Sequence, residues 1–291
     1  IEVCKEVGIN YKSARTIFER NALEVRSVAQ ACQRHGIDYR NGGTVFRWDS
    51  DNIERIVEVC QQYGIKYKNG GVIFQRNADE IVDIVRICKA YGIRYQDGGN
   101  IFRTTPQEVK KIADVCYKYG VEYKNAGIVF MRPSEEVEAI IQKCIKYGIS
   151  YKNGGIVFRR KSDEIDKIVE VCERLGINYK NGGTLFYKNA NEIEEMVNIC
   201  KEYNFDYNDG AAVFNSNPEE LKDVFEVCLE LGIDYHVNGS LFLRNADEIR
   251  EIAKICEENG IKYKSGTIAF RKTPEEVREI IDVCRELGIN Y

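Results

Sequence analysis

Residues Asn77 to Arg103 read NADEIVDIVRICKAYGIRYQDGGNIFR, and close variants of this segment follow one another through a chain of 291 residues. One cysteine marks the register of every copy, always 28 residues after the previous one, at Cys4, Cys32, Cys60, Cys88, Cys116, Cys144, Cys172, Cys200, Cys228, Cys256 and Cys284. A fixed period without insertions is typical of tandem-repeat proteins, whose units stack on their neighbours. The sequence therefore predicts a solenoid built from one 28-residue module.

The cysteine of each module occupies the same place in a predicted helix, which favours a small, buried packing side chain. Equivalent side chains on stacked helices are expected about 8–10 Å apart. That distance is too long for a disulfide or for shared tetrahedral metal binding. We therefore predict reduced thiols and no metal or other cofactor. Free thiols in this number favour a reducing compartment, so the expected location is the cytoplasm.

The first half of the module carries the start and stop signals of an α-helix. Polar N-cap residues, which can accept first-turn N–H groups, stand at Asn21, Asp49, Asn77, Thr105, Asn189, Asn217, Asn245 and Thr273. Glutamate follows most of them three residues later, as in a capping box, and the first helical position holds Pro106, Pro218 and Pro274. One apolar face recurs at helical spacing, made in the quoted copy by Ile81, Ile84, Val85, Cys88 and Tyr91. Glycine then suits a left-handed C-cap, with Asn204 in its place once.

The second half, Ile-x-Tyr-Lys-Asn-Gly-Gly-x-Ile-Phe-x-Arg, supports two structures. Asn-Gly between apolar residues is a hairpin signal, whereas the spacing of Tyr67, Gly71 and Phe74 fits a short second helix. We favour a tight turn followed by a short helical or 3₁₀ segment. The alternative is one short parallel strand per module, as in leucine-rich repeats.

These patterns predict an all-α fold: a right-handed-type α-solenoid of ten 28-residue repeats, each with one long helix and a short helical or turn segment. The alternative is an α/β solenoid of the leucine-rich-repeat type. Residues 1–291 are expected to form a single tandem-repeat domain with partial repeats at both ends. Because solenoids normally need polar caps, such ends would allow self-association or a protein partner.

No motif for catalysis is present. The two histidines, His35 and His236, occupy different places in the module, and no nucleophile elbow, phosphate loop or zinc pattern occurs. No apolar run approaches the roughly 18–20 residues that cross a membrane. We therefore expect a binding protein, neither an enzyme nor a membrane protein.

Two columns of basic residues stand out in a chain whose net charge is −4. One precedes the Asn-Gly-Gly turn and comprises Lys12, Arg40, Lys68, Lys124, Lys152, Lys180 and Lys264. The other follows the phenylalanine and comprises Arg20, Arg47, Arg76, Arg103, Arg132, Arg159, Arg160, Lys188, Arg244, Arg271 and Lys272. A basic ridge over the turns would neutralise phosphates, while placement around helix ends explains the same charges without a ligand.

Short motifs in the module resemble helical repeats that bind nucleic acid. Cys32-Gln33-Arg34-His35-Gly36, Thr273-Pro274-Glu275-Glu276-Val277 and Asn41-Gly42-Gly43 resemble transcription-activator-like effector repeats, and the segment Val157 to Ile165 resembles the mitochondrial transcription termination factor family. The resemblance to effector repeats, in which turn residues face DNA, implies base-facing residues at Asn41, Asn69, Asp97, Asn125, Asn153, Asn181 and Asp209.

Nucleic acid is therefore the first expected partner, with DNA ahead of RNA. The basic columns would hold the phosphate backbone, and the turn residues would face the bases. A protein- or peptide-binding scaffold and a self-assembling structural array are the alternatives.

Overall fold

The computed structural model describes residues 1–11, 15–41, 43–207, 212–236, 239–265 and 268–290. Its contacts divide the chain into two units, which are described separately. The first comprises Ile1–Gln142 and Tyr151–Phe158, and the second comprises Lys143–Ser150 and Arg159–Tyr291.

Each module contains one α-helix. The helices are α1 (Glu2–Glu6), α2 (Ala22–His35), α3 (Ser50–Tyr63), α4 (Ala78–Tyr91), α5 (Pro106–Tyr119), α6 (Ser134–Tyr147), α7 (Ser162–Leu175), α8 (Ala190–Glu202), α9 (Pro218–Leu231), α10 (Ala246–Glu258) and α11 (Pro274–Leu287). All eight predicted N-caps are confirmed, because each side chain accepts the N–H group three residues later. Left-handed glycines close most of the helices, and Asn204 takes the same conformation with φ 53°.

A short 3₁₀ helix (η) lies in the second half of each module. These segments are η2 (Arg15–Glu19), η3 (Thr44–Arg47), η4 (Val72–Gln75), η5 (Asn100–Arg103), η6 (Ile128–Met131), η7 (Ile156–Arg159), η8 (Thr184–Tyr187), η9 (Val213–Asn215), η10 (Gly239–Leu243) and η11 (Ile268–Arg271). The favoured prediction of a turn and a 3₁₀ segment is confirmed. The strand alternative is wrong for the described residues, which contain no strand.

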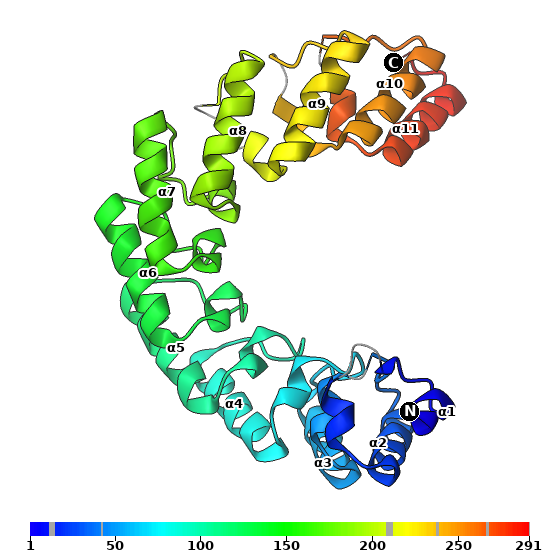
Figure 1. The fold of residues 1–291 in the computed structure, drawn as a ribbon, viewed down its shortest axis with the longest axis vertical. Helices are drawn as coiled ribbons and strands as arrows, with labels where there is room; N and C mark the ends of the chain where they lie inside the picture. The colour runs from blue at the N-terminus through cyan, green and yellow to red at the C-terminus, as the bar shows by residue number, and fades with distance from the viewer. Residues whose placement is uncertain (12–14, 42, 208–211, 237–238, 266–267, 291) are drawn as a thin grey trace. The chain divides into compact units, whose positions relative to one another are not determined.

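Helices that follow one another along the chain pack in series within each unit. In the first unit each helix from α1 to α5 contacts the next one along the chain, and each 3₁₀ helix from η2 to η6 does likewise. The same holds in the second unit for α7 to α11 and for η8 to η11. Figure 1 draws α2 to α5 side by side in chain order. Each unit thus has a layer of α-helices beside a layer of 3₁₀ helices, and the prediction of an all-helical, solenoid-type repeat is confirmed.

The core of each module lies between the two layers. In the quoted copy Ile81, Ile84 and Cys88 are fully buried beneath the helix, and Ile101 and Phe102 are fully buried beneath the 3₁₀ segment. Tyr91, predicted on the apolar face, is only half-buried, because its hydroxyl reaches a carboxylate of the next helix.

The cysteines are free thiols, as predicted, and ten of the eleven are buried. Burial raises the pKa of the Cys88 and Cys116 thiols to about 12. They are therefore neutral at physiological pH and act as packing atoms.

Candidate nucleic-acid interface

Neighbouring modules are joined at the turns by a backbone hydrogen bond. In the first unit the N–H of Asp38 donates to the carbonyl of Lys68 (2.7 Å), and that of Glu122 donates to Lys152 (2.6 Å). The same bond recurs from Asn10 to Arg40, from Lys66 to Gln96 and from Arg94 to Lys124, and in the second unit from Ser150 to Lys180 and from Asp234 to Lys264. Every acceptor residue belongs to the slot just before the turn, so this bond fixes that slot relative to the preceding module.

The backbones approach each other closely at this point. A side-chain carbon on Gly70 would lie 1.9 Å from the carbonyl oxygen of Asp38, and one on Gly98 would lie 2.3 Å from that of Lys66. Both glycines also have positive φ, near 61° and 64°. The first glycine of the Asn-Gly-Gly turn is therefore required by the stacking of modules as well as by the turn itself.

The basic residues just before the turn, which form the first predicted column, are exposed where these bonds join the modules. Arg40, Lys68, Lys124 and Lys152 in the first unit, and Lys180 and Lys264 in the second, are all exposed to solvent. We call these six residues the turn-edge cations. Their backbone carbonyls are held by the preceding module while their side chains remain at the surface. Lys12 lies outside the described residues.

The second predicted column contains residues from two different slots, which the structure separates. Arg20, Arg76, Arg132, Arg160 and Arg244 share one slot, and we call them the stacking arginines. The Nε of each donates to the carbonyl of the next module's buried phenylalanine, as in Arg76 to Phe102 (3.2 Å) and Arg244 to Phe270 (3.3 Å). A second nitrogen of Arg76 reaches the carbonyl of Arg103 (2.7 Å), and Trp48 Nε1 makes the equivalent bond to Phe74 (2.6 Å). These guanidinium groups join modules together.

The remaining members of that column have varied surroundings. Arg47, Arg103, Arg159 and Arg271 come one residue earlier in the module and are exposed. Arg103 Nε donates to Asn100 (3.2 Å). Lys188 occupies the stacking-arginine slot and is 9% exposed, whereas Lys272 in that slot is exposed and lies 3.6 Å from Glu276.

The turn residues proposed to face bases also shape the turn. The Oδ1 atoms of Asn69, Asn153 and Asn181 accept the N–H groups of the second glycine at 3.0–3.1 Å. Asp97 instead pairs with Lys66 (2.8 Å) and Arg94 (2.9 Å), and the hydrogen bond from Lys66 lowers the pKa of its carboxyl. Asn41 and Asn125 are exposed, and Asp209 lies outside the described residues. For the bonded asparagines, the side-chain NH₂ group is the remaining hydrogen-bond donor.

The helix layer carries its own polar contacts, which the sequence pattern did not reveal. Tyr91 donates to Asp114 (2.5 Å), which Lys110 also contacts (2.7 Å). Equivalent contacts link Tyr119 to Glu138, Tyr147 to Asp166 and His35 to Glu54. His35 pairs with a carboxylate of the next helix, and its side chain is partly exposed.

Among the described residues, no group of three or more His, Cys, Asp and Glu side chains is placed to hold a metal ion. Within those same residues, no helix is both long enough and apolar enough to span a membrane. No protein-family model, curated protein or solved structure matches this chain.

Proposed function

We propose that this protein binds the phosphate backbone of a nucleic acid along the turn-edge cations of each unit, with DNA first among the ligands to test. One observation carries the proposal: a backbone hydrogen bond aligns one exposed cation per module in most modules, whereas the stacking arginines are engaged with carbonyls. Each aligned Lys or Arg neutralises a phosphate and releases its counterion.

The mode of binding that this arrangement favours is independent of base sequence. Phosphate contacts position a nucleic acid but carry no sequence information. Asn69, Asn153 and Asn181 accept turn N–H groups with their side-chain oxygens, so each is left with the same NH₂ donor. The bonded asparagines therefore do not support a code in which each module reads one base. We propose that the surface contacts the phosphate backbone of the strand instead.

Acidic neighbours moderate the attraction. Asp38 accepts the backbone N–H of Arg40 (3.2 Å), and Glu122 accepts that of Lys124 (3.0 Å), so two carboxylates of the first unit lie beside the column. The net charge of −4 adds a weak long-range repulsion. We therefore expect modest affinity at low salt. If the four cations of the first unit each contact one phosphate, the logarithmic salt slope should be about −3 for a single strand and about −4 for duplex DNA.

The test is fluorescence anisotropy of labelled single-stranded DNA, duplex DNA and RNA, measured from about 50 mM to about 200 mM salt. The test variant replaces Arg40, Lys68, Lys124 and Lys152 with glutamine. The control replaces the exposed helix cations Lys5, Arg86, Lys89 and Lys111 with glutamine, which changes the net charge equally. Loss of binding in the test variant alone supports the turn-edge column. Equal weakening in both variants, or no binding at the lowest salt, overturns it.

A further inference from the structure

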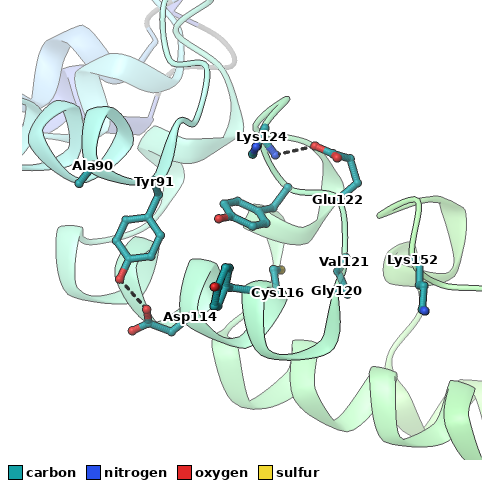
Figure 2. Close-up of a pocket in the computed structure, with 11 residues that line it drawn as sticks. Ala90, Tyr91, Asp114, Cys116, Gly120, Val121, Glu122, Lys124 and Lys152 are labelled. Atoms are coloured by element: carbon teal, nitrogen blue, oxygen red, sulfur yellow. Dashed lines mark hydrogen bonds between the residues drawn. The ribbon is translucent and has the colours of Figure 1, made fainter.

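A hollow of about 790 Å³ opens in the first unit beside the last turns of α4 and α5. Figure 2 shows Tyr91 and Asp114 at one side of it and the turn-edge cations Lys124 and Lys152 elsewhere along its wall. Its lining also includes Tyr117 and Tyr123. The hollow thus combines three tyrosines with two members of the proposed phosphate-binding column.

Tyr117 occupies a slot whose residue type varies between modules, with Lys89, Ile145 and Leu229 among its other occupants. Four modules carry Gln or Glu at this slot, and that side chain hydrogen-bonds to the tyrosine hydroxyl six residues later: Gln33 to Tyr39 (2.7 Å), Gln61 to Tyr67 (3.2 Å), Glu173 with Tyr179 (2.9 Å) and Glu257 with Tyr263. Here the slot holds an aromatic side chain instead, and Tyr117 is 78% exposed. This module therefore presents an exposed aromatic ring at a slot where four other modules form an internal hydrogen bond.

The tyrosine six residues after Tyr117 has no hydrogen-bond partner for its hydroxyl among the described residues. Tyr123 is only 8% exposed, yet its hydroxyl forms no hydrogen bond with any described residue. In other modules the equivalent hydroxyl also donates to a helix-end carbonyl, as Tyr235 does to Tyr203 (3.0 Å). Tyr95 likewise lacks a hydroxyl partner among the described residues, but the slot beside it holds Lys89 and no aromatic ring. Tyr123 lines the open hollow, so its hydroxyl is available to donate to a ligand there.

The charged groups of the hollow are unequally available. Asp114 is engaged by Tyr91 (2.5 Å) and Lys110 (2.7 Å), and Glu122 accepts the backbone N–H of Lys124 (3.0 Å). No ion pair is found for the side chains of Lys124 and Lys152 among the described residues, and both are exposed. The Cys116 thiol is buried and neutral, so it does not act as a nucleophile in the hollow.

We infer that the hollow holds one nucleotide of the bound strand. The base stacks on the ring of Tyr117 and accepts a hydrogen bond from the Tyr123 hydroxyl, and the adjoining phosphate faces Lys124 and Lys152. Stacking on an aromatic side chain is tolerant of base identity, which fits a column that follows the backbone. This inference rests on the proposed function and adds an aromatic contact at one module to its electrostatic contacts.

The experiment compares two probes of equal length: a thymine oligodeoxynucleotide and the same deoxyribose-phosphate chain without bases. The turn-edge cations bind both probes, and the hollow adds affinity only for the probe with bases, by about tenfold. The variant Tyr117→Gln restores the residue type of other modules and should abolish that tenfold difference while leaving the abasic probe unaffected. Tyr123→Phe should reduce the difference by removing the donor.

Leu229→Gln is the matched control, because Leu229 fills the same slot of the second unit and is 59% exposed. It should leave the tenfold difference intact. Far-UV circular dichroism melts verify that each variant is folded, and Tyr117→Gln should melt no lower than wild type, since the introduced amide can bond the Tyr123 hydroxyl. Equal affinity for the two probes, or a difference that survives Tyr117→Gln, overturns the nucleotide site alone. If neither probe binds at low salt, the turn-edge column and the nucleotide site both fall.

Discussion

Arg76 Nε lies 3.2 Å from the carbonyl oxygen of Phe102, which belongs to the next module. Its second bond, to the carbonyl of Arg103, closes a fork over the end of η5. Carbonyls at a helix end have no partner within the helix, and the guanidinium group supplies two donors in a fixed planar arrangement. The side chain of Arg76 is only 17% exposed, so solvent competes weakly for these bonds.

Replacing Arg76 with lysine should therefore lower the free energy of unfolding by about 2 kcal/mol, because hydrogen bonds from a charged donor are lost while the charge is kept. The measurement is the urea unfolding midpoint. Arg103→Lys, one slot away from the stacking position and exposed, should change it little. A variant as stable as wild type would refute the joining role of this arginine.

Ala126 adopts φ 50° in the slot where other modules place glycine with φ 61–64°. Left-handed backbone disfavours residues with a side chain, so Ala126→Gly should raise the free energy of unfolding by about 0.5–1 kcal/mol. The reverse change, Gly98→Ala, should lower it by at least about 1 kcal/mol, since the new carbon would meet the Lys66 carbonyl. Chemical denaturation measures the free energy of unfolding of both variants. A change of the same sign in both would contradict this explanation.

Stability should fall in acid as the carboxylates between helices become protonated. A hydrogen bond from Lys110, followed by one from Tyr91, lowers the pKa of Asp114, and cations act likewise on Glu54, Glu138 and Asp166. A lowered pKa in the folded state stabilises the fold above the unfolded value of about 4, and this stabilisation is lost as pH drops through the folded value.

The effect is modest at each site, because these side chains are partly solvated. Asp114→Asn isolates one contribution: its urea midpoint should lie below that of wild type at neutral pH and converge with it in acid. A gap between the two proteins that widens as the pH falls would contradict the assignment.

Thiol reactivity should report on module packing. Cys284 is the one cysteine of eleven that is not buried, and burial raises the pKa of the Cys32, Cys60 and Cys144 thiols to about 12. At mildly alkaline pH a chromogenic disulfide should therefore label about one thiol quickly, and the buried ten only after urea is added. Mass spectrometry of the labelled peptides should place the fast label on Cys284. Rapid labelling of several thiols would contradict the burial of the other ten cysteines.

The sequence predicts the helix layer well because its signals are local. Asn77 caps α4, Pro106 begins α5 and Gly92 ends α4, and each signal involves atoms within a few residues along the chain. The second half was ambiguous for a physical reason. Ile37 and Tyr39 are buried on either side of an exposed Asp38, as in a strand. Among the described residues, however, the Asp38 N–H makes one backbone bond to the next module, to the carbonyl of Lys68.

The candidate site was predicted only in part. Periodicity correctly placed Lys68 and Lys124 at equivalent exposed slots, but it could not show that Arg76 turns toward the next module, because its acceptors are backbone carbonyls common to every residue type. The Tyr123 hydroxyl, unpaired among the described residues, could not be predicted either. It is recognised only by comparison with modules in which the structure shows the equivalent hydroxyl paired, as in the bond from Gln33 to Tyr39. The right-handed course and the count of ten repeats stay predictions.

Modules recognise one another at the turns through main-chain atoms, and the donor slot tolerates Asp38, Lys66, Arg94, Glu122 and Ser150 alike. Acidic, basic and hydroxyl side chains there all leave the same N–H in place. Point mutations can consequently rewrite the electrostatics of this edge one charge at a time without disturbing the register. The charge of the turn edge can therefore change during evolution while the backbone bond between modules is kept. Ligand affinity can evolve separately from the ability to fold.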